Sequence, residues 1–169
     1  MTNYDFCQHV CSMIGQPYSQ TDCIGLIRKA AGIRCQGTNW LWRSFDSSGK
    51  YRYLIHRLER PPTKTEIYNG LLVFRIRWDQ IPPNYSDKPN CHHVGVIVGK
   101  DVIHSSSVRG KVIREPYEVD DWSGAGWLKF IDAPDAVYID PDPDQEEERP
   151  AELSDHDMLL AIYNKLIID

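Results

Sequence analysis

The chain has 169 residues, which is enough for one compact domain with a sizeable core and a short appendage. Its hydrophobic fraction of 41% and charged fraction of 25% are those of an ordinary globular protein. The formal net charge of -5 argues against nucleic acid as a partner, because phosphate binding needs clustered Lys and Arg.

No apolar run is long enough to span a membrane. The N-terminus has neither the basic nor the long apolar region of a secretory signal. The sequence therefore predicts a protein that is made in the cytoplasm and that leaves it, if at all, by another route.

Five cysteines are present, namely Cys7, Cys11, Cys23, Cys35 and Cys91. Their odd number and irregular spacing, together with the missing signal, argue against a disulfide framework. A buried cysteine without a disulfide usually acts as a small apolar residue. Each thiol must therefore be judged by its surroundings.

The first part of the chain is expected to be helical. Apolar residues at helical spacing predict a helix from Tyr4 to Ile14, and a second helix runs from Asp22 or Cys23 to Ala31. Asp22, or Thr21 before it, is suited to cap the second helix. Cys23 then lies in its first turn, where unpaired N–H groups and the helix dipole are expected to lower the pKa of the thiol.

The rest of the chain to residue 139 is expected to be rich in strands. Residues 37–60 are irregular and aromatic, with a short helix near 40–45. Alternating apolar residues predict a strand at 70–78, and the runs 92–99 and 101–106 predict a β-hairpin. Further strands are expected at 111–114, 126–133 and 136–139. A helical part followed by strands predicts an α+β fold with an antiparallel sheet.

The last thirty residues differ from the rest in composition. Residues 140–153 are acidic and contain proline, which predicts an extended linker. Residues 154–169 predict an amphipathic C-terminal helix with a broad apolar face. This helix is expected to pack on the 1–139 domain or on a partner, or to mediate self-association.

Two of the six histidines have a distinctive position. His93 opens one strand of the predicted hairpin and His104 closes the other, so the two rings are expected to lie as diagonal neighbours. One ring can then serve as a base and the other can orient it. His92 is expected to point to the opposite face of its strand, and His9, His56 and His156 have no distinctive context.

The candidate residues Cys23, His93 and His104 follow one another in the order cysteine, histidine, histidine, and the stretches around them form three motifs. The stretch GQPYSQTDCIGLIRKAAGI resembles the cysteine motif of the NlpC/P60 cell-wall peptidases, in which a tyrosine loop leads into Asp-Cys at a helix start. The stretches NGLLVFRI and HHVGVIVGKDVIHSSS resemble that family's following strands. The resemblance extends over roughly residues 7–138.

The resemblance implies a papain-like fold in which a nucleophile helix packs on an antiparallel sheet. It implies a cysteine peptidase that hydrolyses γ-D-glutamyl bonds in peptidoglycan stem peptides and needs neither a metal nor another cofactor. Cys23 is then the nucleophile, His93 the base and His104 the residue that orients the base. Tyr18 and Asp22 match positions that line the substrate site. A thiolate of Cys23 paired with protonated His93 is the expected attacking form.

The sequence departs from the family pattern directly after the nucleophile, where Ile24 replaces the usual serine. That serine helps some members to recognise a free N-terminal amine on the stem peptide, so the departure affects the predicted specificity. The missing signal and the appended helix fit a phage or prophage protein. Such a protein acts on the wall after release or as part of a phage tail.

Three other interpretations remain open. A cysteine amidase or acyltransferase of the same fold would act on another amide or ester. An inactive binding module would keep the fold without the chemistry. A metal site built from Cys91, His92, His93 and His104 is disfavoured, because adjacent strand residues point to opposite faces and paired ligand spacings are absent.

Overall fold

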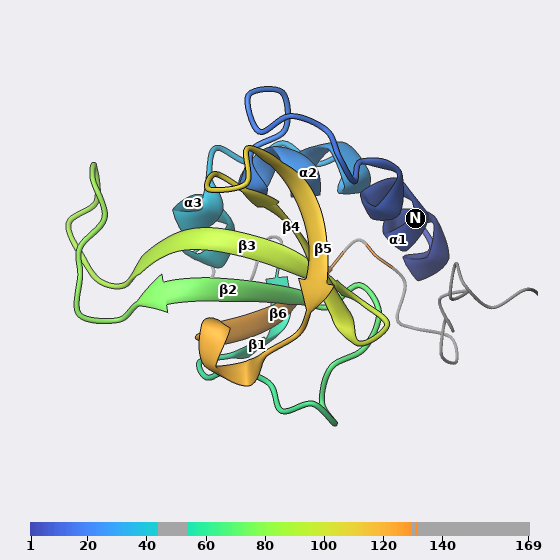
Figure 1. The fold of residues 1–169 in the computed structure, drawn as a ribbon. Helices are drawn as coiled ribbons and strands as arrows, with labels where there is room; N and C mark the ends of the chain where they lie inside the picture. The colour runs from blue at the N-terminus through green and yellow to red at the C-terminus, as the bar shows by residue number, and fades with distance from the viewer. Residues whose placement is uncertain (44–53, 130, 132–169) are drawn as a thin grey trace, which may run out of the picture. The chain divides into compact units, whose positions relative to one another are not determined.

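The computed structural model describes residues 1–43, 54–129 and 131 (Figure 1). The predicted strand at 136–139, the linker 140–153 and the C-terminal helix 154–169 lie outside these residues. None of the helices in the described ranges is long and apolar enough to cross a membrane.

A six-stranded antiparallel sheet forms the centre of the fold, and it confirms the α+β class (Figure 1). Its order is β1-β6-β2-β3-β4-β5, so the three consecutive strands β3, β4 and β5 lie side by side at one edge. The strands are β1 (Leu54–Leu58), β2 (Leu72–Arg77), β3 (Asn90–Val98), β4 (Asp101–Ser106), β5 (Lys111–Pro116) and β6 (Gly124–Leu128).

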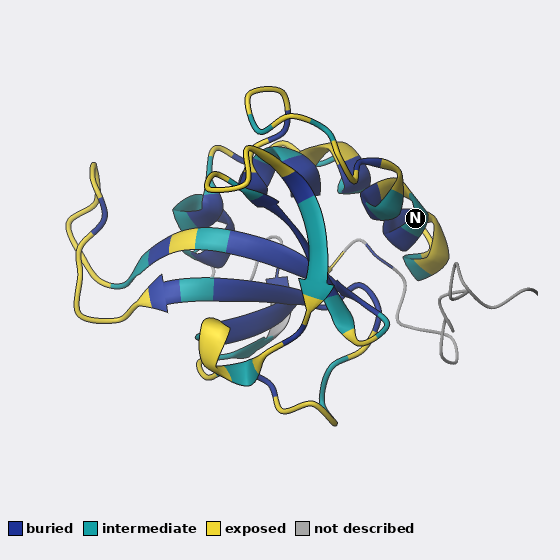
Figure 2. Ribbon diagram, viewed as in Figure 1, coloured by how far each residue is buried: buried dark blue, intermediate teal, exposed yellow. Residues whose placement is uncertain are grey.

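Three helices pack on the sheet through a shared apolar core. They are α1 (Asn3–Ser12), α2 (Cys23–Ala31) and α3 (Thr38–Arg43), and their inward sides are buried (Figure 2). The core joins helix residues such as Leu26 and Trp42 to Phe74 and Val96, which are strand residues of one parity. Burial of such side chains is the main stabilising term of a domain of this size.

Strand residues of the opposite parity form a second, smaller apolar cluster. Val73, Ile97 and Val102 meet Tyr117 and Trp122, which flank the 3-10 helix η1 (Val119–Asp121). The sheet is therefore covered on both faces, and its central strands are buried on both sides.

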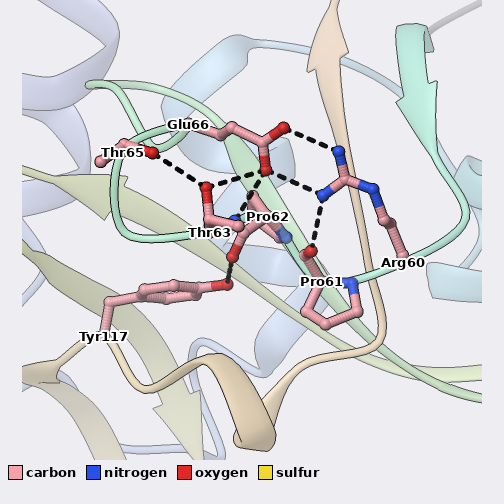
Figure 3. Close-up of polar contacts among 7 residues, drawn as sticks. All are labelled: Arg60, Pro61, Pro62, Thr63, Thr65, Glu66 and Tyr117. Carbon is pink, nitrogen blue, oxygen red and sulfur yellow. Dashed lines mark hydrogen bonds and ion pairs between the residues drawn. The ribbon is translucent and has the colours of Figure 1, made fainter.

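The long loop between β1 and β2 is held by a network of polar groups (Figure 3). Arg60 forms two hydrogen bonds to the Glu66 carboxylate, at 2.7 and 2.8 Å, and the Thr63 N–H donates to the same carboxylate at 2.8 Å. The Tyr117 hydroxyl donates to the Pro62 carbonyl at 2.6 Å and so ties the loop to the smaller cluster.

Most predicted elements are present, although their bounds differ in several places. Strand β1 was not expected, α3 begins at Thr38 rather than at residue 40, and β6 ends at Leu128 rather than near residue 133. All five residues of β6 are buried, so its sequence carries no alternation that would mark its bounds. The Thr38 hydroxyl donates to the Cys91 carbonyl at 2.8 Å, a long-range contact at the first residue of α3 that no local pattern predicts.

Candidate active site

Cys23 is the first residue of α2, and local signals place it there. The Asp22 carboxylate accepts a hydrogen bond of 2.7 Å from the Gly25 N–H and caps the helix, as expected. Gly32 ends the helix in the left-handed region at φ 66°. Cys23 is buried, with 9% of its surface exposed.

The start of α2 is attached to the strands that carry the two histidines. The Ser105 hydroxyl on β4 donates to the Thr21 carbonyl, one residue before the cap. The backbone N–H of Val94 hydrogen-bonds the Cys23 sulfur. Val94 follows His93 on β3, so Cys23 lies beside the backbone next to the predicted base, whereas the His93 side chain contacts His104 and Trp122.

The expectation of a lowered thiol pKa at Cys23 is wrong. Burial raises the pKa of the Cys23 thiol, and the neighbouring Asp22 carboxylate raises it further. The N–H groups of Val94, Ile24 and Cys23 itself act in the opposite direction but do not outweigh burial. The residue that caps the helix therefore also disfavours a resting thiolate.

The two histidines of the hairpin are hydrogen-bonded to each other. His93 Nε2 and His104 Nδ1 are 2.9 Å apart, and the rings are perpendicular. Gly95 is the residue that pairs with His104, so His93 lies two positions along β3 as its diagonal neighbour. The predicted geometry of this pair is confirmed.

Trp122 and Arg75 surround the histidine pair. The Trp122 ring stacks on His93 with centroids 5.9 Å apart, and it meets His104 edge to face at 5.9 Å. The Arg75 guanidinium lies 4.8 Å from the centroid of the Trp122 ring. Packing removes water from both rings, and the positive charge of Arg75 disfavours a further positive charge on them.

The surroundings keep both rings neutral. Burial, together with the charges of His104, Arg75 and His92, lowers the pKa of His93 to about 3. Burial also lowers the pKa of His104, although Glu115 opposes this effect. A neutral imidazole at His93 and a neutral thiol at Cys23 are therefore the resting forms near pH 7, in place of the expected ion pair.

Gly95 allows the close approach of the groups around the pair. A Cβ at this position would lie 2.7 Å from Val102 Cγ2, 3.0 Å from the Trp122 ring and 3.2 Å from His104 Cβ. Any side chain would therefore displace Trp122 or His104. The sequence pattern did not predict that position 95 requires a glycine.

Tyr18 lies near Cys23, the candidate nucleophile. Burial raises the pKa of the Tyr18 phenol, and negative charge at Cys23 and at Asp22 raises it further. Tyr18 and Asp22 also line an open hollow of about 700 Å³, together with Arg28 and Lys29. Neither Cys23 nor His93 lines this hollow, so it adjoins the candidate catalytic groups rather than containing them.

The remaining candidates point away from the site. Ile24 is 6% exposed and belongs to the core, so its side chain has no access to a substrate. His92 is exposed and Cys91 is fully buried, which agrees with their expected alternation. Among the described residues, no three His, Cys, Asp or Glu side chains are grouped as metal ligands would be.

Glu115 also belongs to this region, and the sequence pattern did not predict it. Its carboxylate Oε1 lies 2.8 Å from His104 Nε2. The predicted strand ended at residue 114, two positions too early, because β5 continues to Pro116. Alternation continued along that strand would have placed Glu115 on the face of the hairpin that carries His104.

Comparisons with protein-family models, with curated proteins and with solved structures find no match to this chain.

Proposed function

We propose that this chain is a cysteine peptidase of the NlpC/P60 type that hydrolyses amide bonds, in particular γ-D-glutamyl bonds, in peptidoglycan stem peptides. The observation that carries the proposal is the hydrogen-bonded pair of His93 and His104 on β3 and β4, with the Cys23 sulfur bonded to the next residue along β3. The sequence motifs supply the substrate class and the pairing of Cys23 with His93, and the histidine pair supports a base that a second ring holds in orientation.

The first step begins from neutral groups. As the Cys23 sulfur attacks the substrate carbonyl, its proton passes to His93, which acts as a general base. The tetrahedral intermediate carries a negative oxygen, and the backbone N–H of Cys23 at the start of α2 is a suitable donor to it. His104 holds the ring of His93 in orientation during the transfer.

The second step releases the products. His93 returns its proton to the leaving amine, the carbon–nitrogen bond breaks, and a thioester remains on Cys23. Water then attacks the thioester while His93 accepts a proton from it. The acid product leaves and the thiol is restored.

The hollow beside the nucleophile is the proposed binding site for the peptide. Tyr18 and Asp22 line it on the side of Cys23, and Arg28 and Lys29 add positive charge. Lys29 already donates to the Gln20 carbonyl at 2.9 Å and to the Thr21 hydroxyl at 2.7 Å, so it holds the loop before the cap. A stem peptide carries both amine and carboxylate groups, and this mixture of charges suits it.

A cysteine amidase or acyltransferase of the same fold is the second candidate. Ile24 favours this alternative, because its side chain lies in the core and supplies no hydroxyl for a free N-terminal amine. The triad residues define a reaction class rather than a substrate. For the peptidase, the proposed site of action is the cell wall, reached after release or as part of a phage tail.

Mass spectrometry of digested muropeptides tests the proposal. The wild-type protein is expected to produce new termini at γ-D-glutamyl bonds, and Cys23→Ala is expected to produce none. Cys11→Ala is the matched control, because this half-buried thiol on α1 has no part in the proposed reaction and should leave the products unchanged. Cleavage only between muramic acid and alanine would indicate an amidase, and full digestion by Cys23→Ala would refute the proposed nucleophile.

A further inference from the structure

Three side chains on neighbouring strands form one continuous line of hydrogen bonds. His93 on β3 meets His104 on β4 at 2.9 Å, and His104 meets Glu115 on β5 at 2.8 Å. Val102 pairs with Glu115 in the register of β4 and β5, so Glu115 is the diagonal neighbour of His104. The same diagonal contact between neighbouring strands therefore occurs twice, first between His93 and His104 and then between His104 and Glu115.

Glu115, at the end of this line, determines the proton positions on both histidines. An ionised carboxylate only accepts hydrogen bonds, so His104 Nε2 must carry a proton and donate it to Glu115. A neutral His104 then has a bare Nδ1, which can only accept, and His93 Nε2 must be the donor. A neutral His93 is thereby left with a bare Nδ1.

We propose that Glu115 is a positioning residue that fixes the tautomers of both histidines and so leaves the Nδ1 lone pair of His93 available as the base. The inference rests on the proposed function for the role of His93. It adds a residue to the set of Cys23, His93 and His104. Without Glu115, the hydrogen bonds would end at His104, and either nitrogen of that ring could carry its proton.

The charge of Glu115 has a second effect when His93 takes up a proton. Arg75 on β2 and His92 on β3 disfavour a positive charge on His93, and Arg75 also disfavours one on His104. Glu115 on β5 and Asp121 on η1 are the opposing negative charges at His104. Of these two, Glu115 alone is hydrogen-bonded to the ring, so it stabilises the protonated pair most directly.

The side-chain accessibilities of the pair also suit a positioning role. The His104 side chain is 4% exposed, whereas that of Glu115 is 37% exposed. The buried ring therefore has a charged partner that reaches solvent, and the carboxylate remains hydrated while it orients the ring. A structural contact between β4 and β5 is supplied separately by the 2.7 Å pair of Asp101 and Arg114.

The tautomers can be read directly by NMR of protein labelled with ¹⁵N-histidine, with the signals assigned through His93→Gln and His104→Gln. In the wild-type protein we expect both rings to carry the proton on Nε2. In Glu115→Gln the amide can donate as well as accept, and we expect a mixture in which His93 is partly protonated on Nδ1. A wild-type His93 protonated on Nδ1 would overturn the proposal without any variant.

Kinetics on the stem-peptide substrate provide the second measurement. Glu115→Gln should lower kcat by about 10- to 100-fold with little change in KM, by analogy with other groups that orient a functional histidine. Glu115→Asp keeps the charge and the acceptor-only character and should restore part of the loss. Asp101→Asn is the matched control, because it removes an ion pair between the same two strands and should change neither kcat nor the tautomers.

Two results would count against Glu115. One is a Glu115→Gln protein with wild-type kcat and with both rings still protonated only on Nε2. The other is an equal loss of kcat in Asp101→Asn, which would indicate a general effect on the strands. The tautomer measurement needs no substrate, so it tests Glu115 even if the muropeptide digest shows that the proposed function is wrong.

Discussion

The loop after β1 and the strands β3 to β5 each carry a line of polar side chains, but charge has a different role in the two. In the loop, the Arg60 guanidinium, with the Thr63 N–H and hydroxyl, holds the pKa of the Glu66 carboxyl at about 2, and both groups stay ionised at the surface. In the strands, burial and nearby positive charges lower the pKa of His93 to about 3 and keep the ring neutral.

This difference shows which contacts matter for chemistry. An exposed ion pair helps to hold a loop in place, but solvent screens its charges. Substitution of one of its residues is therefore expected to have a small effect. A buried pair of neutral rings depends on where each proton sits, so a small change alters the reactivity. The predictions below test this contrast, beginning with the largest expected effect.

Substitution of His93 by Gln should reduce kcat by about 10⁴-fold, because the candidate base is lost while the shape of the side chain is roughly kept. The rate at which products form from stem peptides, measured by chromatography, gives the effect. Glu66→Gln is the control from the loop network and should retain wild-type kcat. Activity in His93→Gln within tenfold of wild type would assign the base to another residue.

Substitution of Gly95 by Ala should destabilise the fold by about 1–3 kcal/mol through overpacking, and should also lower kcat. The added Cβ would displace the Trp122 ring or His104, both within 3.2 Å of it. Urea unfolding measures the first effect. Gly37→Ala is the matched control, because a Cβ there meets nothing within 4 Å. Equal stability of the two variants would contradict the crowding at Gly95.

The two networks should lose stability in different pH ranges. The His93 pKa is 6.5 when unfolded and about 3 when folded, so the unfolded chain binds a proton first as the pH falls. Stability from the neutral ring is complete above pH 6.5 and is lost as the pH falls toward 3. Glu66, with values of 4.5 and about 2, contributes above pH 4.5 and loses that contribution as the pH falls toward 2.

Melting temperatures measured from pH 8 to pH 3 separate these contributions. His93→Gln should flatten the fall between pH 6.5 and 4.5, whereas Glu66→Gln should leave that range unchanged. His104, whose pKa is also lowered, should maintain part of the slope. A His93→Gln curve parallel to that of the wild type throughout would show that the folded state does not hold His93 neutral.

Removal of the Tyr117 hydroxyl in Tyr117→Phe should cost about 1 kcal/mol, the usual net value of a buried hydrogen bond. The lost bond is the one to the Pro62 carbonyl at 2.6 Å. Kinetics should be unchanged, because the contact lies in the loop network. A fall in kcat would mean that this loop and the histidine pair are coupled, against the contrast drawn above.

Contacts between residues close together in the sequence were predictable, whereas contacts between distant segments were not. His93 and His104 lie on one hairpin, so strand alternation and a short turn were enough to bring them together. The cap by Asp22 is local to the start of α2 and was also predicted. The α+β class followed from the same local patterns.

The features that were missed depend on how distant segments pack. Trp122 reaches His93 from beyond β5, and β1 is defined by its pairing with β6 far along the chain. The raised pKa of Cys23 comes from burial that only the assembled core provides. Helix position alone predicted the opposite direction, since it accounts for the dipole but not for the loss of water.

A thiol that remains protonated is a poor target for oxidants. Peroxides and disulfides react with the thiolate, and both burial and Asp22 keep Cys23 in the thiol form. Conversion to sulfenic acid is therefore slow while the site is at rest. The carboxylate that caps α2 therefore also protects the thiol from oxidation.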